Sequence, residues 1–370
     1  MSCKILRILP LLALAVLLSG CKMAVLNPSG DVAAQQRDLI VASTVLMLII
    51  IVPVIVLTLF FAWRYRASNT KATYDPEWYH STTLEVVIWA APLAIIIALG
   101  AMTWVSTHLL DPYRPLARVD DGRPVAEDTR PLRVDVVALD WKWLFIYPEQ
   151  GIATVNEMAA PVDVPIEFRL TASSVMNSFA VPALAGQVYA MPGMVTKLHA
   201  VINKAGEYDG FSANYSGAGF SDMRFKFKGM SQDDFNLWVT EAKSAEGALG
   251  RREYLDLAKP SVKAPVQRFA RVENDLYDRI VDRCVAEGRM CMSEMMRIDA
   301  QGGLGLAGTV NVMTERETVG GHGHAAPRVV ERRYVLAYCT PSQPYGVEIP
   351  LPAVRELAEQ ATALTERIAE

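Results

Sequence analysis

Few side chains in this sequence could bind a metal ion or carry electrons, and they are widely spaced. The chain of 370 residues has only five cysteines and five histidines. Four methionines lie within about 50 residues and could offer thioether sulfur to copper: Met176, Met191, Met194 and Met223. No cysteine or histidine adjoins them, so we interpret them as packing residues. His322 and His324 could bind a stray metal ion, and we expect no function for that pair.

An acidic side chain stands directly before a long apolar run. Glu85 precedes residues 86–107, about 22 residues without a charge. Roughly 20 such residues cross a bilayer as a helix. A carboxylate at the start of a helix is favoured by the helix dipole, which explains Glu85 without any function. At a membrane surface the same carboxylate could collect protons. The residues alone leave both interpretations open.

The N-terminal sequence indicates export. Lys4 and Arg7 precede a short apolar core that ends in the tripeptide Leu-Ser-Gly, directly before Cys21. A basic start, an apolar core and small residues before a cleavage point are typical of a signal peptide. Leu-Ser-Gly-Cys resembles a bacterial lipobox, so we expect Cys21 to be diacylated, for example with palmitate, and to anchor the mature N-terminus. An ordinary signal peptide with an incidental cysteine is the alternative.

Cys284, Cys291 and Cys339 follow in the part that we expect to be exported, where disulfides can persist. Three is an odd number, so at least one thiol stays free or pairs with another chain. We expect Cys284 to pair with Cys291, and the count alone also allows pairs that include Cys339.

Two apolar runs, residues 39–63 and 86–107, are long enough to span a membrane. The loop between them carries three basic residues, which favours a cytoplasmic loop. The export signal places the N-terminus outside, so two spans return the chain outside after about residue 108. We therefore expect a multi-pass protein of the bacterial inner membrane, with its N-terminus and C-terminal domain in the periplasm. The net charge of -4 is small and gives no indication of a nucleic-acid partner.

The exported part changes from a β pattern to a helical pattern. From Arg133 to about Phe227, short runs of β-branched and aromatic residues alternate with prolines and glycines, which predicts a β-sandwich. Ser231 is typical of a helix N-cap, and a second helix is expected from Asn274 to Cys284. Residues 300–327 are rich in glycine, and a helix is expected from Pro352 onward.

The segment Trp141-Lys142-Trp143 follows the two spans, and we expect both indoles on one face of a strand. Alone, such a pair indicates core packing. In this position it resembles the aromatic patch of subunit II of haem–copper respiratory oxidases. Residues 151–157 (Gly-Ile-Ala-Thr-Val-Asn-Glu) and 174–179 (Ser-Val-Met-Asn-Ser-Phe) resemble the cytochrome bo-type ubiquinol oxidase branch. The resemblance covers about residues 21–280 and implies a membrane-anchored α+β fold: a two-helix transmembrane hairpin, an all-β cupredoxin-like sandwich and a helical C-terminal extension.

In the cytochrome c-oxidising branch, this sandwich holds a two-copper centre. Its ligands are a histidine and, about 35 residues later, the pattern C-x-E-x-C-x-x-x-H-x-x-M. The resemblance places residues 212–223 on that loop at full length. Asparagine, serine or phenylalanine replaces five of the six ligands, and only the methionine remains: Asn177, Ser212, Asn214, Ser216, Phe220 and Met223.

These replacements predict a loop without metal. A serine hydroxyl is not ionised near neutral pH and cannot bridge copper ions as a thiolate does. A single thioether is a weak ligand. Asn214 also replaces a glutamate that helps to hold magnesium against subunit I in the copper-bearing branch. Without a surface relay for cytochrome c, the family resemblance implies quinol as the electron donor.

We therefore expect a non-redox subunit II of a proton-translocating ubiquinol oxidase, which couples quinol oxidation to the reduction of oxygen to water. The chain itself should hold no cofactor, whereas its partner subunit I should hold haems and copper. Subunits III and IV, the lipid bilayer and, for the whole complex, quinol are the other expected partners. With the resemblance, Glu85 before Val-Val-Ile-Trp becomes the entrance of a proton pathway into subunit I.

Two alternatives compete with this hypothesis. A stand-alone membrane lipoprotein for oxidase assembly or metal handling would need only its acyl anchor, so two spans argue against it. A cytochrome c oxidase subunit damaged by mutation would not show coordinated replacements at preserved loop length. The expected domains are a signal peptide (1–20), a lipidated N-terminus with the hairpin (21–110), a periplasmic cupredoxin-like domain without copper (111–229), a helical arm (230–290) and an extension of unknown role (291–370).

Overall fold

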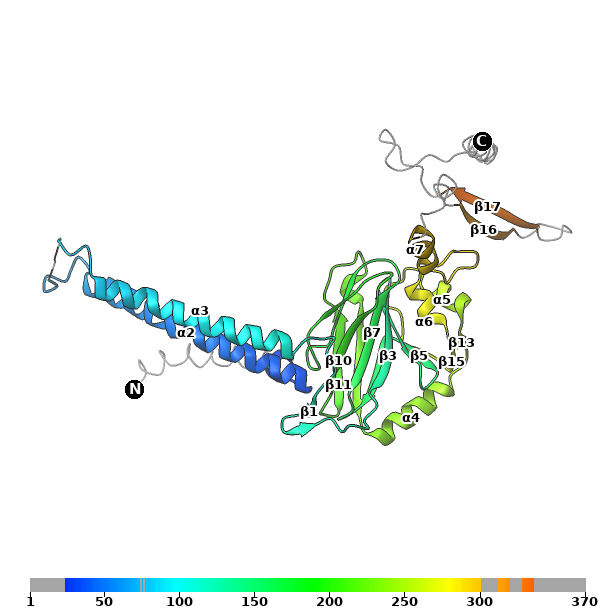
Figure 1. The fold of residues 1–370 in the computed structure, drawn as a ribbon, viewed down its shortest axis with the longest axis horizontal. Helices are drawn as coiled ribbons and strands as arrows, with labels where there is room; N and C mark the ends of the chain where they lie inside the picture. Colours follow the sequence, from blue (N-terminus) through cyan, green and yellow to red (C-terminus); the bar gives the residue numbers. More distant parts are fainter. Residues whose placement is uncertain (1–23, 74, 76, 301–311, 320–327, 336–370) are drawn as a thin grey trace, which may run out of the picture.

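The computed structural model describes residues 24–73, 75, 77–300, 312–319 and 328–335. A pair of long helices leads into a β-sandwich, and short helices lie along one side of the sandwich (Figure 1). Several residues and segments discussed above lie outside the described residues: Cys21, Cys339, His322, His324 and the expected helix after Pro352.

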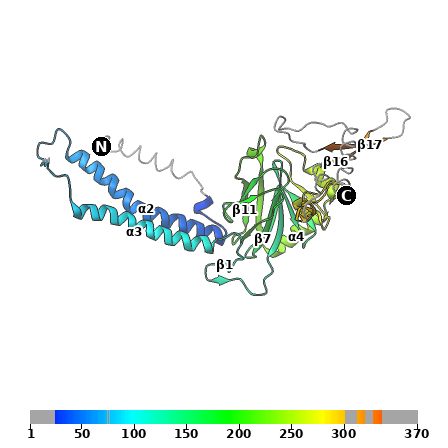
Figure 2. The same cartoon turned by 45° about the horizontal axis from the view of Figure 1, so that its top comes forward.

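Helices α2 (Asp31–Arg64) and α3 (Thr82–Leu109) form an antiparallel hairpin, and they lie side by side in Figures 1 and 2. Both are long and apolar enough to cross a membrane, and their apolar side chains face outward. The first turn of α2 differs from the rest, because Asp31 and the two residues after it are buried. There Asp31 accepts two hydrogen bonds from Arg118, each of 3.0 Å, and so ties the hairpin to the exported part.

The sandwich consists of two sheets. The larger sheet has the strand order β10-β7-β3-β4-β5-β14, with β3 and β7 parallel and the other neighbours antiparallel. Its strands are β3 (Leu132–Leu139), β4 (Lys142–Tyr147), β5 (Ile152–Val155), β7 (Ile166–Ala172), β10 (Thr196–Ala200) and β14 (Gln267–Phe269).

The smaller sheet has the order β6-β12-β11-β8-β9, with β6 and β12 parallel. Its strands are β6 (Glu157–Pro161), β8 (Asn177–Ala180), β9 (Val188–Ala190), β11 (Gly206–Ser212) and β12 (Arg224–Met230). Between β11 and β12 lies the loop on which replaced copper-ligand positions were expected, with a short 3-10 helix η2 (Phe220–Asp222).

The larger sheet is buried on both faces. Along β3, Val134 and Val136 face the smaller sheet, whereas Val137 and Leu139 face the short helices. A strand presents successive side chains to opposite faces, so an almost unbroken apolar run such as that of β3 requires cover on both sides. The face of the larger sheet that points away from the smaller sheet is covered by the segment that follows the sandwich, here called the arm.

The arm consists of α4 (Gln232–Lys243), α5 (Arg251–Leu257), α6 (Leu276–Val281) and α7 (Met292–Ala300), with a small sheet of β13 (Ala248–Leu249) and β15 (Arg271–Val272). The Oγ of Ser231 accepts a hydrogen bond from the backbone N–H of Asp234, which confirms the expected N-cap of α4. The expected helix from Asn274 to Cys284 is shorter, because Asp282 already caps the end of α6.

The helical extension also contains strands that the sequence pattern did not predict. β14 joins the edge of the larger sheet beside β5, and β16 (Val312–Val319) pairs with β17 (Arg328–Val335). Two further short strands, β1 (Arg118–Asp120) and β2 (Arg123–Pro124), and the 3-10 helix η1 (Ala24–Leu26) complete the described elements. The fold class itself, a membrane-anchored hairpin followed by a cupredoxin-like sandwich and helices, is confirmed.

A buried carboxylate fastens the arm to the sandwich. Glu157, 6% exposed, accepts hydrogen bonds from Lys228 (2.8 Å), Trp238 Nε1 (2.9 Å) and Arg268 (2.6 Å). Burial alone would raise the pKa of Glu157, but these three donors outweigh it and lower the pKa. The charge of Glu157 therefore holds β12, α4 and β14 to β6.

Candidate functional site

The structure brings together two positions that stand 35 residues apart in the sequence. The hydroxyl Oγ of Ser212 lies 3.1 Å from Oδ1 of Asn177 and 3.3 Å from the backbone carbonyl oxygen of Asn214. Both Ser212 and Asn177 are almost completely buried, at 4% and 2% exposed. Asn177 begins β8 and Ser212 ends β11, and the two strands pair through Phe179 and Ser212. Two positions that the resemblance predicted to replace copper ligands therefore meet, and both carry neutral hydrogen-bonding groups.

The rest of the loop is held by its own contacts. The amide of Asn214 donates to the carbonyl oxygens of Met176 (3.3 Å) and Tyr215 (3.4 Å). The ring of Phe220 packs edge-on against Tyr215, with the centroids 5.6 Å apart. Met223, 1% exposed, belongs to the core of the sandwich. Phe220 and Met223 therefore fill space by packing, and the side-chain amide of Asn214 provides hydrogen-bond donors for backbone carbonyl oxygens.

Trp141 lies outside this loop and covers it. Its indole Nε1 donates to the carbonyl oxygen of Ser216 over 3.1 Å. A Cβ added to Gly219 would lie only 2.4 Å from the Trp141 ring, and one added to Gly217 would lie 3.2 Å from it. The two glycines are therefore required by the close approach of the indole.

The two tryptophans do not share one strand face as expected. Trp141 has a backbone φ of +67° and forms the turn before β4, so it leaves the alternation of the strand. Trp143 is completely buried and packs edge-on against Phe179 and Phe225, at centroid distances of 5.4 and 5.9 Å. One indole covers the loop and the other fills the core.

The donor set around the loop does not suit a soft metal ion. A surface cavity of about 310 Å³ adjoins it, lined by Phe211, Ser212, Ala213, Phe220, Ser221, Met223 and Arg224. Its side chains offer two hydroxyls and one buried thioether, but no thiolate, imidazole or carboxylate. Copper pairs are held by thiolates and imidazoles, so the residues present do not fit such a centre.

Glu85 lies at the other end of the molecule. It belongs to the first turn of α3, close to the turn between the helices and far from the sandwich (Figure 1). A helix of 28 residues is about 40 Å long, so Glu85 and Ser212 cannot act on the same group. Its Oε1 lies 3.4 Å from Nε2 of His80, and both side chains are about half exposed. From the sequence alone His80 is most simply an interfacial residue, and its contact with Glu85 was not expected, although the spacing of five residues across the helix start could have indicated it.

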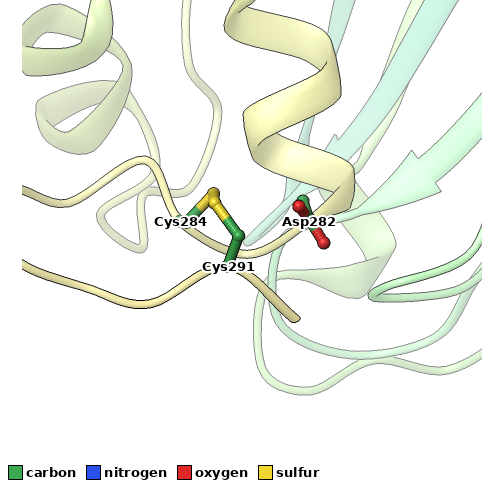
Figure 3. A group of neighbouring side chains, drawn as sticks. All are labelled: Asp282, Cys284 and Cys291. Atoms are coloured by element: carbon green, nitrogen blue, oxygen red, sulfur yellow. A yellow bond between two sulfur atoms is a disulfide. The ribbon is translucent and has the colours of Figure 1, made fainter. Parts of the chain in front are cut away.

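Cys284 and Cys291 form a disulfide with an S–S distance of 2.00 Å. Figure 3 shows the bridge next to Asp282, which lies at the end of α6. The ligand atoms of these three residues lie within 4.8 Å of one another. In the part of the chain that the structure describes, this is the one convergence of three or more His, Cys, Asp or Glu side chains that could hold a metal ion.

Known proteins with a similar sequence include curated relatives from three bacteria. The chain is 52% identical to "Cytochrome bo(3) ubiquinol oxidase subunit 2" of Pseudomonas putida over 276 residues, which covers 75% of this chain and 85% of the relative. It is 51% identical to the protein of the same name from Pseudomonas aeruginosa, covering 74% and 80%. It is also 51% identical to "Ubiquinol oxidase subunit 2" of Acetobacter aceti, covering 73% and 85%.

Two family models match separate parts of the chain after the hairpin. "Cytochrome C oxidase subunit II, periplasmic domain" matches residues 132–229, the two-sheet sandwich without β14. "COX Aromatic Rich Motif" matches residues 243–288, which include α5, α6 and the strands between them. The match over most of the length of the relatives confirms the resemblance drawn from the sequence. This chain therefore belongs to the subunit 2 family of haem–copper ubiquinol oxidases, closest to the cytochrome bo type.

Proposed function

We propose that this chain is a subunit II without a redox centre in a proton-translocating ubiquinol oxidase. The contact between Ser212 and Asn177 is the observation that carries the proposal. It replaces a thiolate and an imidazole by a hydroxyl and an amide, neither of which changes its charge near neutral pH. Electrons from a water-soluble donor would have no relay in this domain, whereas quinol can reduce a haem of subunit I from within the membrane.

The stabilising role would come from the helical hairpin. The hairpin offers two apolar helices with outward-facing side chains, which can pack against membrane helices of subunit I. We expect subunits III and IV in the same complex, with haems and copper held by subunit I and no cofactor in this chain. Cys21 would carry the lipid anchor, and the turn between α2 and α3 would face the cytoplasm.

Glu85 would supply protons to subunit I from that cytoplasmic turn. A half-exposed carboxylate exchanges protons with water, and the imidazole of His80 lies beside it, a side chain that proteins commonly use to relay protons. Together they would collect protons at the surface where the membrane helices begin. The expected domain limits, 21–110 for the hairpin and 111–229 for the sandwich, remain part of this proposal.

The purified complex tests the proposal. We expect oxygen consumption with a ubiquinol analogue and none with reduced cytochrome c. Metal analysis of the separated subunit with its disulfide intact should find no copper. Oxidation of cytochrome c, or a mixed-valence two-copper signal from this subunit, would contradict the assignment. Purification without haem-bearing partners would instead support the stand-alone lipoprotein.

A further inference from the structure

A run of sulfur-containing side chains lies on the surface of the arm. Residues 290–296 read Met-Cys-Met-Ser-Glu-Met-Met, so four of the 15 methionines of the chain fall within seven residues. Met290, Met295 and Met296 are 46%, 38% and 63% exposed. Core packing explains the buried Met158 and Met223, but it cannot explain methionines that face solvent.

The fold brings a second pair of methionines to this run. Met191 and Met194 flank Gly193 in the turn between β9 and β10. A Cβ added to Gly193 would lie 2.9 Å from Cε and 3.2 Å from Sδ of Met292, and 3.7 Å from Cδ of Arg283. In the sequence, Met292 directly follows Cys291 and Arg283 directly precedes Cys284. In the sequence no cysteine adjoined Met191 and Met194, whereas in the fold the disulfide lies next to their turn.

The two cysteines are held together by more than their own bond. The backbone N–H of Ser293 donates to Oδ1 of Asp282 over 2.6 Å, and that of Met292 donates to the carbonyl oxygen of Asp282 over 2.9 Å. These bonds join the end of α6 to the start of α7 and do not involve sulfur. They would therefore keep Cys284 and Cys291 close after the disulfide is reduced.

We propose that the reduced pair Cys284 and Cys291 binds one Cu(I) ion, with Sδ of Met292 as the third ligand. A dithiol reductant would transfer two electrons and two protons to the disulfide, giving two thiols and the oxidised reductant. Each thiol releases its proton when its sulfur binds the metal. Thiolate and thioether sulfur favour Cu(I), and the surrounding exposed thioethers provide a path of weak ligands for its entry.

The disulfide between Cys284 and Cys291 would prevent metal binding at this site. In the disulfide both sulfurs are bonded to each other and neither is available as a thiolate, so only weak thioethers remain. The arm would therefore hold copper only while the pair is reduced. This inference concerns residues other than those of the loop of Ser212 and does not depend on which substrate the oxidase takes.

Anaerobic titration of the full chain in mild detergent tests the proposal. One sample is reduced with a water-soluble phosphine and one keeps its disulfide, and Cu(I) is added against a chromophoric Cu(I) chelator. We expect the reduced chain to take one more equivalent of Cu(I) than the oxidised chain. The double variant Cys284→Ser, Cys291→Ser, which keeps the other cysteines, should lose that equivalent.

A variant that lacks the proposed thioether ligand distinguishes a loss of Cu(I) binding from a loss of structure. Met292→Leu keeps the cysteines, and we expect it to weaken Cu(I) binding about tenfold or more, a change of 1.4 kcal/mol or more. Met230→Leu at the end of β12 removes a thioether outside residues 290–296 and should leave the affinity unchanged. Circular dichroism should show the same helix content before and after reduction.

Four outcomes would overturn the proposal. They are equal Cu(I) uptake by the reduced and oxidised chains, an unchanged affinity in Met292→Leu, loss of helix on reduction, and displacement of Cu(I) by an equal concentration of Zn(II). The last would identify a zinc site, since two thiolates also suit that ion.

Discussion

The indole N–H of Trp141 donates to the backbone carbonyl of Ser216 across 3.1 Å, and its ring lies against Gly217 and Gly219. A side chain from the turn before β4 therefore shapes the loop from outside. The shape of this loop thus has a structural cause in this protein that does not involve metal.

Gly219→Ala should destabilise the sandwich, because the new methyl group would meet the Trp141 ring at 2.4 Å. Overpacking of this kind costs about 1–3 kcal/mol in the free energy of unfolding. Thermal unfolding of the purified chain measures the effect. In a Trp141→Leu background the same glycine substitution should cost much less. Equal costs in both backgrounds would show that the ring does not cause the strain.

Ser212→Ala should lower the free energy of unfolding by about 1 kcal/mol, since it removes the hydroxyl that meets Asn177 in a buried site. Ser221→Ala, on the exposed side of the same loop, is the matched control and should change stability by less than about 0.5 kcal/mol. Quinol oxidase activity should be unchanged in both variants. A large loss of activity in Ser212→Ala alone would show that the loop still has a catalytic role.

Glu85→Gln should slow proton uptake and turnover of the purified complex severalfold, because an amide cannot carry a proton into subunit I. His80→Gln should have a smaller effect, because it removes a neighbouring imidazole that can relay protons but leaves the carboxylate in place. Glu77→Gln, an exposed acid on the same turn, serves as the control. Stopped-flow proton uptake checks all three variants. Unchanged uptake in Glu85→Gln would leave that residue as a helix-start carboxylate only.

Glu157→Gln should detach the arm at neutral pH. The pKa of Glu157 is lower in the fold than in the unfolded chain, so its charge stabilises the fold above the ordinary glutamate range, and this contribution is lost as the pH falls through the lowered pKa. The variant should lose about 3 kcal/mol at pH 7 and show a flatter acid dependence of unfolding. Glu241→Gln removes only a 68%-exposed partner of Arg268 and should be nearly neutral. Identical acid profiles for Glu157→Gln and the unmodified chain would contradict this role.

Much of the fold was predictable because it depends on local patterns. The two apolar runs form α2 and α3, and Ser231 is the N-cap of α4, as its hydroxyl side chain indicated. The strands β3, β4, β7 and β10 lie where β-branched and aromatic residues are dense. The position of Trp141 was not predictable in this way, because a left-handed residue interrupts the alternation on which the strand rule depends.

By itself, the sequence determined the family and the membrane-anchored fold class, and it predicted the positions at which copper ligands are replaced, because these depend on residue types and spacing along the chain. Only the tertiary structure decided what those positions do. It joins Asn177 to Ser212 across 35 residues, places β14 on the sheet edge and brings Gly193 to Met292. Such contacts depend on how the sheets and the arm pack against each other. Burial of apolar surface stabilises that packed arrangement as a whole, so no short segment of the sequence specifies it.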